Sequence, residues 1–375
     1  MRIALVHELL TMKGGAEKVL RVLAEMFPDA PVYTLLYDEK KMGDWFPKER
    51  VRTSRVQKLA DRWPLKAGRY NHHLYLPFFP RAAEAWDFSG FDLVISSSSA
   101  FAHGIITNGK PKHLCYVHAP ARYLWDRTHD VLEQAGKGPF GRLRRGYLSR
   151  IFHRLRTWDA EAADRPDKLL AASATVQRRI SLYWSRPSEV LFPPIDDVWL
   201  TQLPSPERKG ADDGGEYYLV VSTLVPYKRI ALAIEAANLR KTPLKIAGSG
   251  PDLERLQSLA GPTVEFLGFV PDADLPALYA GARATLFPGN EDFGLVPLES
   301  LACGTPVIAY RAGGATETLT EETAAFFDDP TPHALADAIG RFERTKRSPD
   351  ACRKRAAAFS RKRFEEGIRA AIDSL

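Results

Sequence analysis

Residues 2–36 decide the expected fold; they read RIALVHELLTMKGGAEKVLRVLAEMFPDAPVYTLL. The apolar run at 2–6 predicts a strand, and two adjacent glycines at 14–15 predict a turn. A set of apolar residues then recurs at helical spacing: Val19, Leu20, Leu23, Met26 and Phe27. Residues 32–36 predict the next strand. A strand, a glycine turn, a helix and another strand are typical of the start of a parallel α/β sheet.

The same alternation continues through the chain, with one interruption. Further strands of the first half are expected at 93–96, 113–117, 169–172 and 190–192. Residues 201–215 are rich in Pro, Gly and Asp and predict a linker. After it, strands are expected at 217–222, 244–247, 264–267, 284–287 and 307–309, with helices at 230–239 and 273–281.

We therefore predict two tandem Rossmann-like α/β domains with parallel sheets, at 1–200 and 216–351, facing a cleft. The length of 375 residues suits two domains. A basic helix is expected at about 352–372 in the C-terminal segment 352–375. It could cross back to the first domain or remain a solvated terminal helix, and both alternatives stay open.

The composition is that of a globular protein and not of a disordered or fibrous chain. The chain is 45% hydrophobic and 26% charged, as globular proteins are. Its net charge of +6 suits a phosphate-rich ligand, an anionic membrane or a nucleic acid. Three dispersed cysteines without a C-x-x-C pair favour a reducing cytoplasm and disfavour a zinc site. No apolar stretch approaches the roughly 20 residues of a spanning helix, so membrane contact is expected to be peripheral.

Residues 289–299, GNEDFGLVPLE, carry the first candidate site. Glu291 follows a predicted strand, at the edge where open α/β sheets bind ligands. Gly294 allows close approach of a ligand to the backbone, and the helix after it offers amide groups to a phosphate. Glu299, about one turn into that helix, can accept hydrogen bonds from a ribose diol, and Glu291 can accept them from sugar hydroxyls.

This segment resembles the Glu-x7-Glu signature of family 4 glycosyltransferases, which are retaining enzymes of the GT-B fold. The continuation ACGTPVIA at 302–309 and the glycines at 313–314 followed by Glu317 are also similar to that family. The resemblance implies that Glu291 contacts the transferred sugar and that Glu299 binds the nucleotide ribose. It assigns three donor-binding residues to the helix start: Phe293, Gly294 and Leu295. It implies no metal and no cofactor beyond the nucleotide-sugar substrate.

Residues 221–229, VSTLVPYKR, form a second strand end. Lys228 can neutralise phosphate and is the third catalytic candidate beside Glu291 and the histidine described below. The family usually has an arginine where this chain has Thr223, so one phosphate-binding cation is missing. Arg229 could replace it. The turns at Gly248 and near Val270 resemble the loops beside the nucleoside, although glycine turns can also only shape the fold.

In the first domain, His118 ends a strand and resembles the family histidine that reaches the donor sugar. His7 is a weaker candidate. Gly15 is expected to lie close to the transferred group. Three residues are assigned to acceptor binding: Gly14, Arg122 and Tyr123. Because the glycines at 14–15 do not form G-x-G-x-x-G, a dinucleotide-dependent oxidoreductase is disfavoured.

Two basic stretches lie in the first half. Residues 141–156 carry six arginines interleaved with apolar residues, and 50–81 are basic and aromatic, with Trp63, Tyr70, Tyr75, Phe78 and Phe79. A basic amphipathic helix can lie on an anionic membrane, or it can pack on the sheet with its arginines in water. No nucleic-acid module accompanies the charge, so nucleic acid is not expected as a partner.

The expected function is transfer of a sugar from a nucleotide diphosphate donor to a saccharide or polyprenyl-linked saccharide during cell-surface polysaccharide assembly. Resemblance to bacterial polysaccharide and O-antigen mannosyltransferases favours mannose from GDP-mannose, with a UDP-sugar as the alternative. The expected location is the cytoplasm, peripheral to the inner face of the plasma membrane. A non-catalytic sugar-nucleotide-binding or scaffold protein is the alternative of another class.

Overall fold

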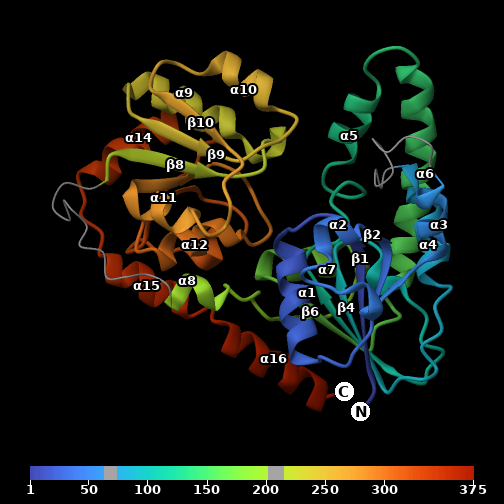
Figure 1. Ribbon diagram of the computed structural model, residues 1–375. Helices are drawn as coiled ribbons and strands as arrows, with labels where there is room; N and C mark the ends of the chain where they lie inside the picture. The colour runs from blue at the N-terminus through green and yellow to red at the C-terminus, as the bar shows by residue number, and fades with distance from the viewer. Residues whose placement is uncertain (63–73, 202–214) are drawn as a thin grey trace. The chain divides into compact units, whose positions relative to one another are not determined.

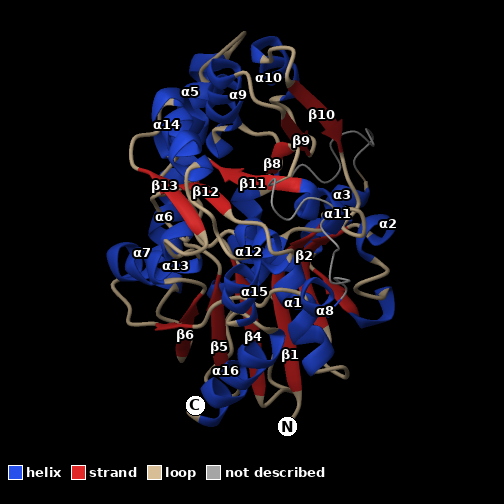
Figure 2. Ribbon diagram, turned by 90° about the vertical axis from the view of Figure 1, so that its left-hand side faces the viewer, coloured by secondary structure: helices blue, strands red, loops and turns tan. Residues whose placement is uncertain are grey.

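The computed structural model describes residues 1–62, 74–201 and 215–375. The chain divides into two compact units, the first comprising Met1–Pro193 with Phe364–Leu375 and the second comprising Pro194–Arg363. Each unit is built around one parallel sheet with helices on both faces, as drawn in Figure 1 and coloured by element type in Figure 2. This confirms the predicted pair of parallel α/β domains.

The first sheet has seven parallel strands in the order β3-β2-β1-β4-β5-β6-β7. Their bounds are β1 Ile3–Leu10, β2 Val32–Tyr37, β3 Val51–Thr53, β4 Leu93–Ser98, β5 Lys112–Val117, β6 Lys168–Ala171 and β7 Glu189–Val190. The strand order reverses direction between β1 and β4, and at such a switch point the loops part to leave room for a ligand.

Helices on one face of this sheet share a core with the strands. Leu20 of α1 (Gly15–Met26), Ile180 of α7 (Ala174–Trp184) and Phe364 of α16 (Arg361–Asp373) pack with Leu5 and Ile95. The other face carries a core built from α3, α4 and α6. The bounds of the other helices of this unit are α2 Glu39–Met42, α3 Arg55–Asp61, α4 Phe79–Ala83, α5 Thr128–Ala135 and α6 Gly141–Ala162. Its short 3-10 helices are η1 Lys48–Arg50, η3 Leu76–Phe78 and η4 Ala102–Gly104.

The second sheet has six parallel strands in the order β10-β9-β8-β11-β12-β13. Their bounds are β8 Tyr217–Val221, β9 Leu244–Ala247, β10 Val264–Gly268, β11 Ala282–Phe287, β12 Val307–Tyr310 and β13 Ala324–Phe327. Its switch point lies between β8 and β11. Helices α9, α10 and α14 share one core with the sheet, and α11 and α12 lie on the opposite face (Figure 1). The helices are α8 Asp197–Thr201, α9 Ile230–Arg240, α10 Leu253–Leu259, α11 Leu275–Gly281, α12 Leu295–Ala302, α13 Ala315–Thr318, α14 Pro332–Glu343 and α15 Pro349–Ala357, with the 3-10 helix η5 Pro226–Lys228.

Two expectations need correction. The single C-terminal helix at 352–372 is wrong, because α15 ends at Ala357 and Ser360 makes a parallel bridge with Ile195 before α16 begins. From Phe364 onward, α16 packs on the first sheet rather than standing solvated. In the stretch 50–81, Tyr75 and Phe79 are buried core residues, not surface aromatics; Trp63 and Tyr70 lie outside the described residues.

Candidate active site

The carboxyl edge of the second sheet brings two predicted catalytic residues together. The loop after β8 leads into η5, which ends at Lys228, and the loop after β11 carries Glu291. Lys228 Nζ lies 2.5 Å from Glu291 Oε1, and the two side chains are 18% and 21% exposed. Because β8 and β11 flank the switch point, this pair lies where open α/β sheets bind ligands.

Two glycines hold the Glu291 loop in place. Gly313 has φ +62°, and a Cβ there would lie 2.3 Å from the Glu291 carbonyl oxygen. A Cβ on Gly314 would lie 2.2 Å from Phe293 Cα, and the Gly314 amide donates to the Glu291 carbonyl at 2.9 Å. Backbone packing of this tightness is open only to glycine, so the pair fixes the position of Glu291.

The start of α12 follows this loop directly. Gly294 has φ +84°, and a Cβ there would lie 2.9 Å from Phe287 Cζ. Gly294, the N-cap residue of α12, has no side chain to cap the helix, and the first amide groups of a helix, here beginning at Leu295, are a typical binding site for an anion. Phe293 is buried with its ring against Phe359 at 5.8 Å, so its side chain serves packing.

Glu299 lies further along α12 and is 6% exposed. The hydroxyl of buried Tyr279 donates to Glu299 Oε2 at 3.2 Å. The sequence reasoning missed Tyr279, since an apolar helix at 273–281 gave no sign of a polar contact. This hydrogen bond orients the carboxylate that the family resemblance assigns to the ribose.

The residues predicted to surround the donor also lie at this edge. Thr223 is exposed after β8, and Arg229 adopts a left-handed conformation with its guanidinium 5.1 Å from the centre of the Tyr310 ring. A Cβ on Gly248 would lie 1.8 Å from the Ser222 carbonyl oxygen, so glycine at this position allows the loops after β8 and β9 to pack closely. Val270 follows β10 by two residues. Their contacts with a nucleotide stay predictions.

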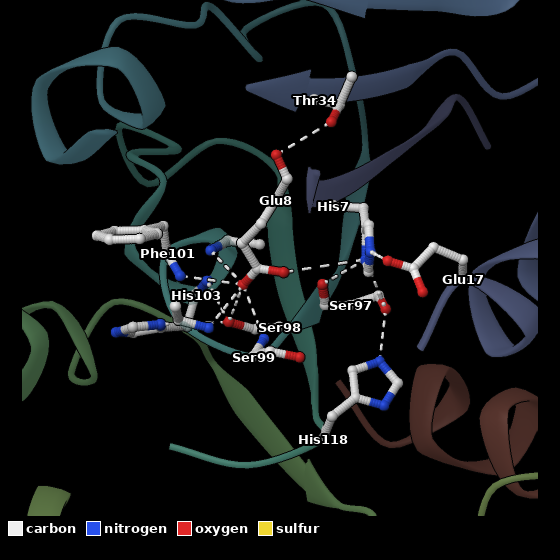
Figure 3. Close-up of polar contacts among 12 residues, drawn as sticks. His7, Glu8, Glu17, Thr34, Ser97, Ser98, Ser99, Phe101, His103 and His118 are labelled. Atoms are coloured by element: carbon white, nitrogen blue, oxygen red, sulfur yellow. Dashed lines mark hydrogen bonds and ion pairs between the residues drawn. The ribbon is translucent and has the colours of Figure 1, made fainter. Parts of the chain in front are cut away.

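The first sheet carries a second polar cluster at its carboxyl edge, drawn in Figure 3. His118 follows β5, and its Nε2 lies 2.8 Å from the Ser97 hydroxyl on β4. The same hydroxyl lies 3.1 Å from His7 Nδ1 on β1, while His7 Nε2 lies 3.4 Å from Glu17 Oε1 on α1. The predicted catalytic histidine is therefore connected to the weaker candidate His7 through a serine.

Glu8 lies beside this cluster with an unusual number of donors. Its Oε1 accepts hydrogen bonds from the Ser98 hydroxyl and from four consecutive backbone amides, those of Ser99, Ala100, Phe101 and Ala102. Burial disfavours the charged form, but His7 and the amides outweigh it and lower the pKa of Glu8 to about 2. A buried carboxylate with these donors fixes the loop that leads into η4.

The two histidines are shifted in opposite directions. Burial opposes a charge on His7, but the hydrogen bond and charge of Glu17, with Glu8 and the Ser97 carbonyl, raise the pKa of His7 above its ordinary value. Burial and then the charge of His7 lower the pKa of His118 to about 3. Of the two, His7 is the more easily protonated, and His118 is a neutral imidazole at neutral pH.

The other predicted residues of the first unit have structural partners. Gly14 and Gly15 begin α1, and a Cβ on Gly14 would lie 2.6 Å from Glu17 Oε2. Arg122 Nε lies 3.7 Å from Asp126 Oδ2, and the Tyr123 ring packs on Phe152 at 5.6 Å. Their assignment to acceptor binding stays a prediction. Sequence reasoning missed three residues of the histidine cluster: Glu8, Glu17 and Ser97.

Comparison with known proteins identifies the domain that this geometry forms. Residues 203–359 match the sequence model of the family described as Glycosyl transferases group 1. This part of the chain therefore has the sequence of a glycosyl transferases group 1 domain, and the predicted GT-B fold is confirmed.

Relatives and solved structures agree with this assignment. The chain is 38% identical over 138 residues to the GDP-mannose-dependent alpha-(1-6)-phosphatidylinositol dimannoside mannosyltransferase of Mycobacterium tuberculosis (strain ATCC 25177 / H37Ra), covering 35% of this chain and 36% of that protein. It is 31% identical over 210 residues to the D-inositol 3-phosphate glycosyltransferase of Acidothermus cellulolyticus, covering 49% and 47%. The matches thus span between a third and a half of these relatives.

Among solved structures, Anabaena HepE in complex with UDP and glucose matches with a TM-score of 0.71 at 17% identity, covering 99% of each chain. Sucrose-phosphate synthase from Thermosynechococcus elongatus matches with a TM-score of 0.62 at 19% identity, covering 97% of this chain and 94% of that one. These likenesses confirm the fold along the whole chain.

Proposed function

We propose that this chain is a retaining glycosyltransferase that moves a hexose from a nucleotide diphosphate donor to an acceptor hydroxyl. The observation that carries the proposal is the ion pair between Lys228 and Glu291 at the switch point of the second sheet. When the nucleotide diphosphate leaves, negative charge develops on its phosphates, and Lys228 would stabilise that charge together with the amides that begin α12.

In this proposal Glu291 binds hydroxyl groups of the transferred sugar, and Glu299 binds the ribose diol. His118 contacts the sugar from the first unit. The lysine and the helix start supply the positive charge, so the reaction would require no metal ion. Activity that survives thorough treatment with a chelator is the expected result, and loss that is restored by added Mg²⁺ or Mn²⁺ would refute this part.

Mannose from GDP-mannose is the proposed donor. Support comes from the names of the M. tuberculosis relative and of a Mycolicibacterium smegmatis relative, 36% identical over 153 residues, which is called a GDP-mannose-dependent alpha-(1-6)-phosphatidylinositol monomannoside mannosyltransferase. A UDP-sugar is the alternative, since the structurally similar HepE was solved with UDP and glucose. A non-catalytic sugar-nucleotide-binding protein is the alternative of another class.

A thermal-shift panel of GDP, UDP, GDP-mannose and UDP-glucose separates the donors, because a ligand that binds the folded state raises the unfolding temperature. We expect the guanosine compounds to stabilise the protein more than the uridine compounds. Turnover with UDP-sugars only would overturn the mannose assignment. Binding without any release of GDP, across a panel of lipid-linked and free saccharide acceptors, would favour the non-catalytic alternative.

The proposed acceptor is a polyprenyl-linked saccharide, reached from an anionic membrane surface in cell-surface polysaccharide assembly. The support is the first half of α6 with its N-cap residue, where Phe140, Leu143 and Tyr147 are 81%, 73% and 61% exposed. Exposed basic residues surround them: Arg142, Arg144, Arg145, Arg150 and Arg154. The second half of α6 instead packs on the core through Phe152 and Leu155, as the packed alternative expects, so the membrane proposal rests on the first half alone.

No helix within the described parts of the chain is long and apolar enough to cross a membrane. The proposed binding to a bilayer uses α6, where each basic residue near an anionic surface contributes about 1 kcal/mol. We expect cosedimentation with phosphatidylglycerol vesicles and loss of it in Leu143→Ser/Arg150→Glu. Reversal of two exposed cations elsewhere, Lys354→Glu/Arg369→Glu, changes the net charge more than the test variant does and should still alter binding little. Equal loss in both variants would contradict a role for α6.

A further inference from the structure

A continuous line of polar contacts joins α1 to His118 across three elements (Figure 3). Glu17 Oε1 lies 3.4 Å from His7 Nε2. His7 Nδ1 lies 3.0 Å from the Ser97 carbonyl oxygen and 3.1 Å from the Ser97 hydroxyl. The hydroxyl then lies 2.8 Å from His118 Nε2. His7 is 2% exposed and Ser97 is fully buried, so the contacts between these two residues are shielded from water, whereas Glu17 and His118 are part-exposed.

The acceptors in this line determine where the protons are. A carbonyl oxygen only accepts, so His7 Nδ1 carries a proton that it donates to the Ser97 carbonyl. The ionised carboxylate of Glu17 also only accepts, so His7 Nε2 carries a proton as well. His7 is then an imidazolium, in agreement with its raised pKa.

With both nitrogens of His7 protonated, the Ser97 hydroxyl cannot donate to His7. Within the described residues, His118 Nε2 is the other partner of this hydroxyl, at 2.8 Å. Ser97 therefore donates to His118 Nε2, and the proton of a neutral His118 lies on Nδ1. The Nδ1 side of the ring faces away from the serine (Figure 3).

We propose that Glu17, His7 and Ser97 are positioning residues that hold His118 as a neutral imidazole and direct its Nδ1–H at an oxygen of the bound sugar. The inference rests on the proposed function, in which His118 contacts the donor sugar. It makes His118 a hydrogen-bond donor rather than a cation or a base. No proton is transferred and no covalent bond changes in this role.

The surrounding groups favour this arrangement of charge. Glu8 Oε2 lies 3.9 Å from His7 Nδ1, so two carboxylates face the imidazolium. The ring of Tyr116 meets His118 edge-on at 5.1 Å and brings no charge. A second cation on His118 would lie near His7, whose ring centre is 6.4 Å away, so burial together with this repulsion lowers the pKa of His118 and keeps it neutral.

Nitrogen-15 NMR of histidine-labelled protein without ligand tests the proton assignment directly. At neutral pH we expect His118 to be protonated on Nδ1 only and His7 on both nitrogens. Ser97→Ala should shift His118 to the Nε2–H tautomer that dominates in water, while Ser97→Thr should retain Nδ1–H. Ser96→Ala is the matched control, because Ser96 makes a similar 2.7 Å contact to His113 on the same strands. An Nε2–H tautomer in the wild type overturns the proposal.

Glu17→Gln provides a second test at a residue that lies at the start of a helix, should the Ser97 variants fail to fold. It should lower the pH at which His7 loses its second proton. An unchanged titration of His7 would contradict the proposed role of Glu17. In transfer assays Ser97→Ala should lose about tenfold in kcat, the effect of one hydrogen bond, and Ser97→Thr should restore most of it. If the NMR result is as expected but His118→Ala leaves transfer unchanged, the proton arrangement stands and the role of His118 at the sugar is refuted. If the wild type transfers no sugar at all, the proposed function fails instead.

Discussion

Lys228 and Glu291 are 63 positions apart in sequence, and their charged groups are 2.5 Å apart in the structure. The parallel crossover that places β8 beside β11 brings them together. Without a donor they neutralise each other. A bound nucleotide sugar would separate the pair, because its phosphate would bind Lys228 and its sugar hydroxyl groups would bind Glu291.

This relationship predicts the outcome of a double-mutant cycle. Lys228→Ala and Glu291→Ala should each lower kcat by roughly 10²–10³-fold, as removal of a group that stabilises transition-state charge does. The double variant should lose less than the product of the two, because the residues act together. Steady-state transfer kinetics measure all three. The control is Lys245→Ala, which breaks a surface contact to Glu265 at 3.7 Å and should leave kcat unchanged.

The glycines behind Glu291 predict a difference in stability. Gly313 and Gly268 both have positive φ, +62° and +69°, but only a Cβ at Gly313 would meet the backbone, at the Glu291 carbonyl. Gly268→Ala should cost about 1–2 kcal/mol for its conformation alone, and Gly313→Ala should cost more. Denaturant unfolding gives both values. Equal losses of unfolding free energy in the two variants would contradict this prediction, because they would show that the backbone moves aside for a Cβ at Gly313 without an energetic penalty.

The hydroxyl of Tyr279 predicts an effect on donor affinity. Tyr279→Phe removes a donor to Glu299 Oε2 and should destabilise the fold by about 1 kcal/mol. If Glu299 binds the ribose, the KM for the donor should also rise several-fold while kcat changes little. Tyr217→Phe removes a comparable hydroxyl contact, to the Leu278 carbonyl at 2.8 Å, and should alter stability without altering KM.

The buried carboxylate of Glu8 predicts a dependence of stability on pH. Its pKa in the folded protein is about 2, below the ordinary value of 4.5. A lowered pKa means that the contribution is complete above pH 4.5 and is lost as the pH falls toward 2. Glu8→Gln should cost about 2–4 kcal/mol at neutral pH, and the difference from wild type should shrink in acid. A difference that is constant from pH 7 to pH 3 would contradict the assignment.

Much of the fold was predictable from the sequence because buried parallel strands appear as apolar runs. Two strands were missed. β3 has only three residues, of which Arg52 and Thr53 are exposed, so it shows no apolar run. β13 is four residues long and follows Thr323 without a glycine or proline turn. Neither strand supplies a residue of the candidate site.

The candidate site was predictable only in part. Glu291 and Lys228 stood out because each follows a strand, but nothing local indicates that their side chains meet. Ser97 belongs to a run of four serines that looks like a loop, whereas three of them continue β4 into the core. Pairing of a buried serine with two histidines depends on strand order, and strand order is a property of the folded sheet.

The most direct test of the central claim combines binding and transfer in wild type and Glu291→Ala. With GDP-mannose and a lipid-linked saccharide acceptor, the wild type should release GDP and form a mannoside that keeps the anomeric configuration of the donor, as judged by NMR of the product. Glu291→Ala should still bind GDP but lose transfer by at least about 10²-fold. Transfer that continues unchanged in Glu291→Ala, or an inverted product, would contradict the account.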